Sequence, residues 1–434
     1  MIKSLVRCII CLIPVFLLNR SADAQIISGS ASVKLSGPAT KEQTLKAEIL
    51  AQKKLRTELL HWLEDEGEIT IDTSNAVSNQ CFLMFLDTCR NAAKTETSFR
   101  GKELTLSYVL TADTVKQKIE EYNKVVDAEA LKAWETLDEA LKAEDIQAIY
   151  RNSVKGVYFT RAHFGPPLAT PERGGRDLEE DFQRILQKFY DKTRITSTGM
   201  ILSGKTGLAV ENPPAVEVIV DSLPFTGMAL SGKLQDGTIL FSDKTDENGK
   251  LVVNTFRIPF VANGTLMEIY PNPAPVLGIT GFLNPEDFGI KFNNSQVQNF
   301  MFKIISPVYT LEYQAASVSN ITLPPEFADE ARVRKFLRDS CFLREKSGTA
   351  PVDLDISLKT QISSYTFDAT EEISIKVSSE IIVNGLLLNP PRKKENQMVF
   401  EKRYGRYQEI PYGLYFWEAN NELRKAIKAT IAGL

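Results

Sequence analysis

The spacing of hydrophobic residues changes along the chain, and each spacing predicts a helix or a strand. Small and apolar residues alternate from Ser28 to Leu35, which predicts a strand. Thr40 is placed to cap a helix that runs to about Trp62. The apolar face of this helix is expected to consist of residues at helical spacing, namely Leu45, Ile49, Leu55, Leu59 and Leu63.

Strand and helix patterns continue to alternate in the first half of the chain. We expect strands over residues 68–72 and 103–111 and a short helix over 114–122, which complete an α/β module at residues 25–125. The segment 126–194 is predicted to be helical. Within it, Asp145 caps one helix, and the Gly/Pro-rich stretch from Gly165 to Gly175 precedes another helix over 177–190.

From about Ile195 the pattern is that of short strands. Val216, Val218 and Val220 occupy alternate positions, and Asp236-Gly237 and Asn248-Gly249 are typical turn dipeptides. This predicts a β-sandwich at residues 195–323.

Pro324-Pro325 opens the last region, residues 324–434. A helix over 327–337 is followed by strands around 354–358, 373–377 and 381–388 and by a terminal helix over 417–431. The fold class is therefore predicted as α+β multi-domain, with N-terminal and C-terminal α/β modules flanking a helical segment and a β-sandwich.

Residues 1–24 have the parts of a secretory signal peptide. Lys3 and Arg7 accompany an apolar run from Cys8 to Leu18, and Ala22-Asp23-Ala24 completes a cleavage site. The apolar run is shorter than the roughly 20 residues that a membrane-spanning helix needs. We expect cleavage after Ala24, export to the periplasm or the outer-membrane and cell-envelope region, and no transmembrane segment later in the chain.

The charge balance narrows the range of partners. Removal of Lys3, Arg7, Arg20 and Asp23 from 51 basic and 55 acidic residues leaves a net charge of −6. Proteins that bind nucleic acid carry basic patches that displace counterions. We therefore expect no nucleic-acid partner.

Three cysteines remain after cleavage. In an oxidising compartment Cys81 and Cys89 are candidates for a disulfide that closes a short loop, or they stay unbonded. Cys341 lies in an apolar context and is expected to be a buried small hydrophobic residue.

One stretch matches a nucleotide-binding motif letter by letter. Residues Gly199 to Thr206 fit the pattern G-x-x-x-x-G-K-T, in which Lys205 would contact phosphates. The phosphates of such a loop are held by the N-terminus of a following helix. Pro213-Pro214 leaves no room for that helix, so we predict a strand at 200–202 and no nucleotide cofactor.

The other candidates for chemistry are few. His61 and His163 are the two histidines, and neither has a partner at metal-ligand spacing, so we expect no metal. Asp243, Asp246 and Asn248 precede Gly249, but the ligand spacing of a calcium loop is not met and a hairpin turn is predicted. His163, on a Gly/Pro-rich stretch, is the residue on which an alternative function as an exported hydrolase depends.

Two segments resemble known families. Gly29-Ser30-Ala31, the helix with Ala47 and Ala51, and Leu106-Ser107-Tyr108 resemble the envelope module of bacterial outer-membrane lipoproteins and of the flagellar assembly protein T family. The stretch from Thr245 to Leu251 resembles the turn of transthyretin-like and bacterial Ig-like domains. Both resemblances imply non-catalytic modules, and neither supplies catalytic residues.

These observations favour an exported, non-catalytic protein of the cell envelope that acts as an interaction or assembly module. Its partner would be an envelope or outer-membrane protein, or a cell-wall component. Tyr404, Arg406 and Tyr407 interleave guanidinium with aromatic rings and are predicted to lie on a loop that binds the partner. The alternative is that these tyrosines pack beneath the terminal helix.

Overall fold

The computed structural model has the predicted mixed α+β, multi-domain fold. It describes residues 25–35, 39–65, 69–169, 176–318, 321–367, 372–386, 391–405 and 408–434. The predicted signal peptide and two residues of the predicted partner surface, Arg406 and Tyr407, lie outside these ranges. The chain forms two compact units, which comprise Met1–Lys192 with Pro273–Phe292 and Thr193–Asn272 with Asn293–Leu434.

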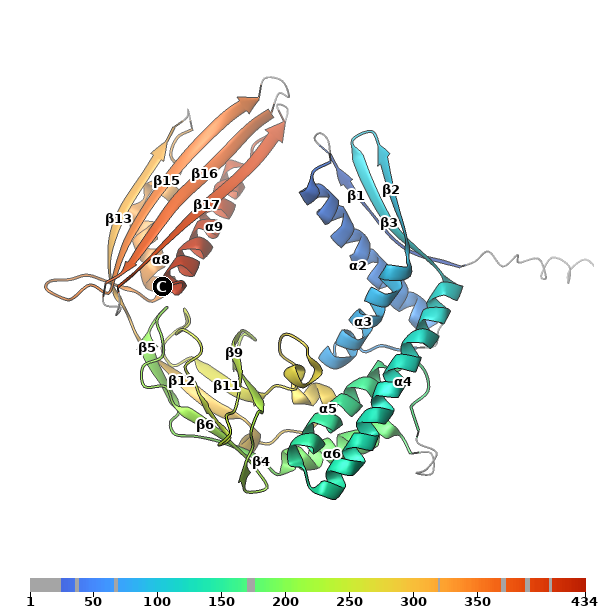
Figure 1. Ribbon diagram of the computed structural model, residues 1–434. Helices are drawn as coiled ribbons and strands as arrows, with labels where there is room; N and C mark the ends of the chain where they lie inside the picture. Colours follow the sequence, from blue (N-terminus) through green and yellow to red (C-terminus); the bar gives the residue numbers. More distant parts are fainter. Residues whose placement is uncertain are drawn as a thin grey trace, which may run out of the picture. The chain divides into compact units, whose positions relative to one another are not determined.

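The first unit begins with a three-stranded antiparallel sheet of order β1-β3-β2. Helix α2 packs against β1 and β3, and α3 follows it (Figure 1). The bounds are β1 Ile26–Lys34, α2 Lys41–Asp65, α3 Ala76–Ala92, β2 Lys94–Arg100 and β3 Glu103–Thr111. The strands predicted at either end of this module are confirmed, whereas residues 69–72 are not a strand, and α3 was not predicted.

The buried face of α2 differs in part from the prediction. Thr40 caps the helix as expected, since its Oγ1 accepts from the Gln43 N–H at 3.2 Å while Gln43 Oε1 accepts from the Thr40 N–H at 3.1 Å. Leu55, Leu59 and Leu63 are buried, but Leu45 and Ile49 are 55% and 56% exposed. The first turns of the helix instead face the sheet with small residues, Ala47 and Ala51, both buried.

Three helices complete the first unit. They are α4 Ala112–Ala143, α5 Ile146–Ala162 and α6 Leu178–Asp191. The short helix predicted over 114–122 is part of the much longer α4, which runs through the expected domain boundary at residue 125. The cap at Asp145 is confirmed, because its side chain accepts from the Ala148 N–H at 3.0 Å.

A short segment from the middle of the chain also belongs to the first unit. Pro273–Phe292, expected inside the β-sandwich, contains the 3-10 helices η2 Ala274–Leu277 and η3 Pro285–Phe288. Asn75 Nδ2 and the Arg161 guanidinium both donate to the Asp287 carbonyl, and Gln187 exchanges two hydrogen bonds with the Lys291 backbone. These bonds place the segment against α3, α5 and α6.

The second unit begins with two sheets. One has the order β10-β6-β4, with β7 beside β6, and the other has the order β5-β12-β11-β8-β9. Val216, Val218 and Val220 of β6 are buried as predicted. The bounds are β4 Thr193–Ser197, β5 Ile201–Lys205, β6 Ala215–Val220, β7 Leu223–Pro224, β8 Ala229–Leu234, β9 Ile239–Lys244, β10 Lys250–Val252, β11 Leu266–Pro271, η4 Asn294–Gln296 and β12 Gln298–Ile305.

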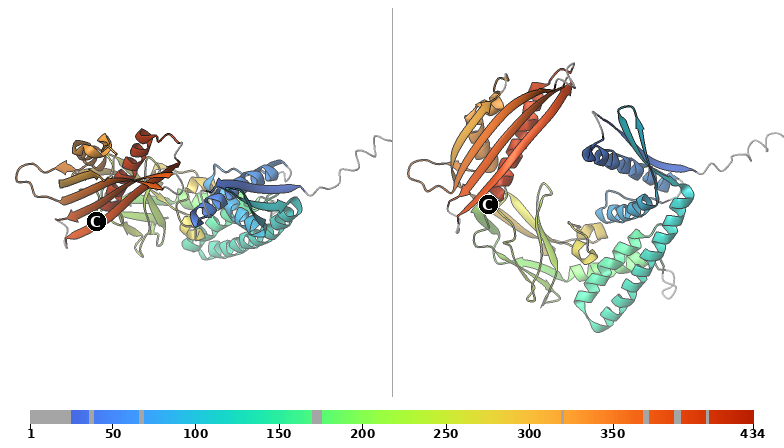
Figure 2. Two further views of the ribbon diagram at one scale, coloured as in Figure 1. Left: turned by 90° about the horizontal axis from the view of Figure 1, so that it is seen from above. Right: turned by 45° about the horizontal axis from the view of Figure 1, so that its top comes forward.

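The C-terminal module is a five-stranded sheet of order β14-β13-β15-β16-β17 with helices on one face. Figures 1 and 2 show its long strands side by side with α9 along them. The module begins before the expected boundary at residue 324, because β13 pairs with β15. The bounds are β13 Val308–Ser317, α7 Pro325–Ala328, α8 Glu330–Cys341, β14 Arg344–Glu345, β15 Leu354–Phe367, β16 Glu372–Gly385, β17 Arg392–Gly405 and α9 Tyr412–Ala432.

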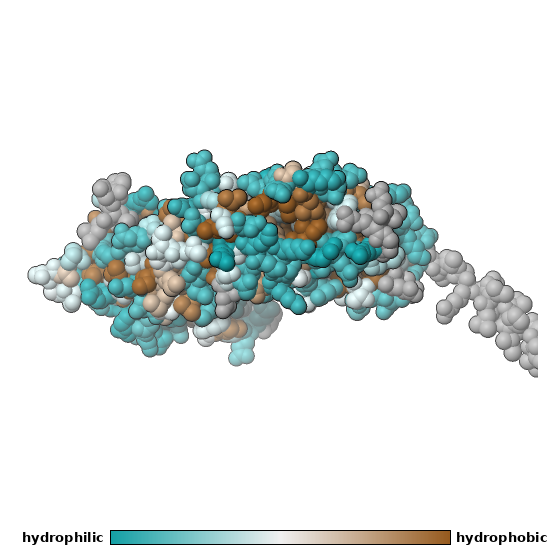
Figure 3. Space-filling model, turned by 90° about the horizontal axis from the view of Figure 1, so that it is seen from below, coloured by the Kyte–Doolittle hydropathy of each residue, from teal (hydrophilic) through white to brown (hydrophobic). Residues whose placement is uncertain are grey.

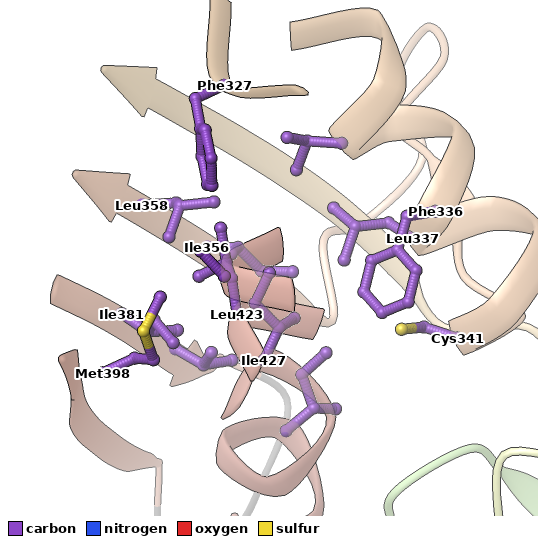
Figure 4. Close-up of a cluster of buried hydrophobic side chains, with 14 of the residues drawn as sticks. Phe327, Phe336, Leu337, Cys341, Ile356, Leu358, Ile381, Met398, Leu423 and Ile427 are labelled. Atoms are coloured by element: carbon purple, nitrogen blue, oxygen red, sulfur yellow. The ribbon is translucent and has the colours of Figure 1, made fainter. Parts of the chain in front are cut away.

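The core of this module lies between the sheet and its helices. Phe327 and Leu337 from α7 and α8 meet Leu423 and Ile427 from α9 over the inward side chains of the strands, among them Ile356 (Figure 4). Alternation along β15 and β16 places every second residue in this core. The two strands predicted over 373–388 are one continuous strand, β16, to Gly385.

Figure 3 shows one face of the molecule, on which hydrophilic residues predominate, with one larger hydrophobic patch and several smaller ones. Within the described ranges, no helix combines the length and the apolar character needed to cross a membrane.

Candidate functional site

His163 ends helix α5 and is held by an acid on α4. Its Nδ1 lies 2.8 Å from Asp127 Oδ1, and its side chain is 13% exposed. The neighbouring Phe164 backbone exchanges two hydrogen bonds with the Asn123 side chain, which also lies on α4. The pair Asp127–His163 is therefore part of a tether between the end of α5 and α4. The imidazole has no hydrogen bond to a hydroxyl or thiol in the described part of the chain.

The nucleotide-like motif forms a strand, as predicted. Ile201–Lys205 is β5, and a turn at Thr206 and Gly207 follows it. Lys205 Nζ lies 2.5 Å from Oδ1 of Asp353, whose side chain is only 6% exposed. Oδ2 of Asp353 accepts from the Val308 N–H at 2.8 Å. Lys205 thus neutralises a buried carboxylate that also positions the start of β13.

We expect Lys205→Ala to lower the free energy of unfolding of the second unit by about 1–3 kcal/mol, because it leaves the buried Asp353 without its cation. Urea denaturation measures the change. Lys303→Ala is the matched control, since Lys303 is exposed and its strand β12 pairs with β5. Equal stability of the two variants would contradict a structural role for Lys205.

Of the two alternatives for Cys81 and Cys89, the structure has the unbonded one. Both residues lie on α3, eight positions apart, which separates them by about 12 Å along the helix. A disulfide needs Cα atoms within about 7 Å. Both thiols are free and buried, and burial raises the pKa of each to about 12. Cys341 is free and buried, as expected.

The acidic stretch before Gly249 is a turn, but not the predicted hairpin turn. The Asp246 carboxylate accepts from the Asn248 and Lys250 N–H groups at 2.9 and 2.8 Å. The flanking strands do not pair with each other, because β9 pairs with β8 and β10 pairs with β6. In the described ranges, no three His, Cys, Asp or Glu side chains are grouped so that they could hold a metal.

The aromatic residues near the C-terminus lie partly in the core and partly on the surface. Those described are Tyr404, Tyr412, Tyr415, Phe416 and Trp417. Tyr404 is the part of the predicted partner surface that the structure describes, and it lies in β17 instead of a loop. Its ring is half-buried and lies 6.3 Å from that of Tyr415. Tyr415 is fully buried, whereas Tyr412 and Trp417 are 47% and 59% exposed.

A groove of about 540 Å³ follows α9. The exposed Trp417 forms part of its wall, together with rings from α8 and β17. Lys402 of β17 forms an ion pair with Glu418, and Lys425 lies 2.7 Å from Glu422. The lining consists of Phe336, Phe400, Trp417, Glu418, Asn421, Glu422, Arg424, Lys425 and Lys428. The groove thus combines exposed aromatic surface with charges of both signs.

A second hollow, of about 650 Å³, lies on the sheet of the same module. Most of the residues that line it are polar, among them Lys359, Lys376, Glu380 and Gln397. This hollow has little aromatic surface. We therefore regard the groove along α9 as the better candidate for a binding site.

The basic run Arg392-Lys393-Lys394 begins strand β17. Arg392 Nη1 donates to the carbonyl of the C-terminal residue Leu434 at 2.9 Å. Lys393 contacts Glu395 in an exposed ion pair. Sequence reasoning missed this strand because its centre is flanked by charges on both sides.

Comparisons with known proteins assign no family. No family model matches the chain, and no curated protein matches it. One similar solved structure is the hypothetical protein CT253 from Chlamydia trachomatis, with 10% identity over 30% of this chain and 100% of the other, at a TM-score of 0.22. Another is a putative protease from Parabacteroides distasonis, with 9% identity over 77% of this chain and 65% of the other, at a TM-score of 0.09.

Proposed function

We propose that the protein is an exported, non-catalytic interaction or assembly protein of a bacterial cell envelope, and that its C-terminal module (residues 308–434) carries the partner surface. The observation that carries this proposal is Trp417, which is 59% exposed on the wall of the groove along α9. The signal-peptide pattern of residues 1–24 supports export.

The groove has the properties of a protein-binding surface. Tryptophan and arginine are the residues that most often dominate binding energy, and they do so where neighbouring contacts exclude water. Here Trp417 and Arg424 lie on a rigid helix, and Arg424 lies 5.3 Å from the centre of the Phe336 ring. A rigid aromatic anchor loses little conformational entropy when it binds.

The alternative, an exported hydrolase at His163, needs a nucleophile or a bound water within reach of the imidazole. The observed partner of His163 is Asp127, and together they tie α5 to α4. This contact gives His163 a structural role that requires no reaction. We therefore favour the interaction function.

We expect a photo-reactive amino acid at position 417, in cells that produce and export the protein, to form a defined adduct with its partner. The matched control is position 365, because Tyr365 is 55% exposed on the sheet of the same module. The adducts are measured by denaturing electrophoresis and mass spectrometry. Adducts that are absent at position 417, or equally frequent at position 365, would contradict the proposed surface.

A further inference from the structure

Strand β17 is a long sheet edge. It has 14 residues and pairs with β16 over its whole length, from Arg392 opposite Gly385 to Gly405 opposite Glu372. The order of the sheet ends at β17, and no described strand pairs with its outer side. An edge of this length presents a row of backbone N–H and C=O groups that can add another strand.

The side chains of β17 alternate between the two faces of the sheet. Met398 and Phe400 are opposite Ser379 and Val377, which are buried under the helices, so they lie on the helix face. Val399 lies on the open face and is 56% exposed. The five central residues, Asn396 to Phe400, carry no charge, while charged residues lie at both ends.

We infer that β17 pairs antiparallel with β17 of a second copy of this chain, about a two-fold axis at Val399. This inference rests on the proposed interaction function and names the partner. In this register Glu395 lies opposite Arg403 of the second copy, and by symmetry the same pair forms twice. On the helix face Met398 lies opposite Phe400 and Lys394 lies opposite Tyr404.

Charge selects this register among its neighbours. In the dimer the helix faces of the two sheets lie on the same side. Residues that lie opposite each other are then both odd-numbered or both even-numbered, so the two-fold axis passes through a residue and the alternative registers are those with the axis at a neighbouring residue. An axis at Met398 places Glu395 opposite Glu401 and Lys394 opposite Lys402. Like charges directly opposite are destabilising in a sheet, and opposite charges are favourable.

The other neighbouring registers are also less favourable. An axis at Gln397 brings Lys393 opposite Glu401 but also Arg392 opposite Lys402, so a complementary pair is offset by a like-charge pair. An axis at Phe400 leaves Glu395 opposite Gly405 and has no complementary pair of charges. Glu395 also contacts Lys393 within its own chain in an exposed ion pair. Among the residues of β17, Arg392–Gly405, the register at Val399 is the one with two complementary pairs and no like-charge pair.

The helices fit the same arrangement. Helix α9 packs on β16 and β17. With strands about 4.8 Å apart, an α9 axis midway between these strands lies about 10 Å from the α9 axis of the second copy. This is close to the 8–10 Å at which two helices pack. The second α9 would then cover the side of the groove formed by Phe400, Glu418, Glu422 and Lys425.

Charge reversal tests the register. The mature chain, residues 25–434, is examined by sedimentation equilibrium, and we expect a dimer. Glu395→Arg and Arg403→Glu should each weaken dimerisation at least tenfold, and the double variant should restore it. Glu380→Arg is the control, since Glu380 is exposed on the neighbouring strand β16, and it should leave the dimer unchanged.

A cysteine tests the axis itself. In the inferred dimer the two copies of residue 399 are directly opposite, so Val399→Cys should form an intermolecular disulfide under mild oxidation. Lys376→Cys on β16 is the control and should remain unlinked. Cys81, Cys89 and Cys341 do not compete, because they are buried and their pKa values are raised to about 12.

A monomer at all concentrations, or a dimer insensitive to Glu395→Arg and Arg403→Glu, would overturn the inference. An extended segment of a different protein bound along β17 would overturn it as well. In either case adducts of position 417 with another protein would still support the proposed interaction function. If those adducts are absent and the chain is also monomeric, both the inferred dimer and the proposed interaction function are contradicted.

Discussion

Replacement of Tyr415 by alanine should lower the free energy of unfolding of the second unit by about 3–5 kcal/mol, the range for large-to-small changes of buried aromatic residues. Tyr415 is 1% exposed, and its ring lies 5.1 Å from Phe400 and 5.2 Å from Phe416. Its hydroxyl donates to the Ile375 carbonyl oxygen at 2.7 Å and lies 3.1 Å from the Phe400 carbonyl oxygen. Alanine would leave a cavity and two carbonyls without this partner.

Two further variants separate the causes. Tyr415→Phe keeps the ring and removes only the hydroxyl, so we expect a loss of about 1–2 kcal/mol. Tyr412→Ala is the matched control on the same helix, because Tyr412 is 47% exposed, and it should change stability by less than about 1 kcal/mol. Thermal and urea unfolding measure all three. A Tyr415→Ala variant as stable as Tyr412→Ala would contradict the described core.

Gly29→Val should destabilise the first unit by about 3 kcal/mol or more, which is the upper part of the range for overpacking. A side chain at Gly29 would meet the backbone nitrogen of Leu55 and the backbone oxygen of Ala51 far inside van der Waals contact. Backbone atoms in a helix cannot turn aside as a flexible side chain can. The variant would therefore have to move α2 away from β1.

The control for Gly29 is its neighbour in the strand. Ser28 lies on the opposite face of β1 and is exposed, so Ser28→Val introduces the same side chain without the contact to α2. Hydrogen exchange of the α2 amides and the unfolding midpoint distinguish the two variants. Unchanged protection of α2 in Gly29→Val would show that the close approach of helix and strand is not required.

The sequence predicts best those elements whose pattern is local. Alternating residues in β3 and β6 and the caps at Thr40 and Asp145 depend on neighbours a few residues away, and these predictions are confirmed. The apolar face of α2 was only half right. Gly29 lies so close to the helix that small residues face the strand there, and this contact joins positions far apart in the sequence.

The candidate site was harder to predict for the same reason. Helix α3 carries apolar residues at helical spacing. Because Cys81 and Cys89 were considered as the ends of a disulfide-closed loop, no helix was predicted there. Tyr404 was expected on a loop but lies in β17, because its position depends on pairing with Ile373 of β16 and on packing near the Tyr415 ring. The groove along α9 combines residues from β17, α8 and α9, and no short stretch of sequence contains them together.

Helix α4 is a continuous mechanical connection between the sheet and the other helices of the first unit. Its 32 residues, about 48 Å, start from a Thr111 cap at the end of β3 and bury Val115 near one end and Leu137 near the other. A pull on the sheet therefore reaches the far helices through one continuous rod and not through a flexible joint. A variant chain in which the N-terminal sheet alone is exchanged would have to be joined within or at the start of this continuous helix.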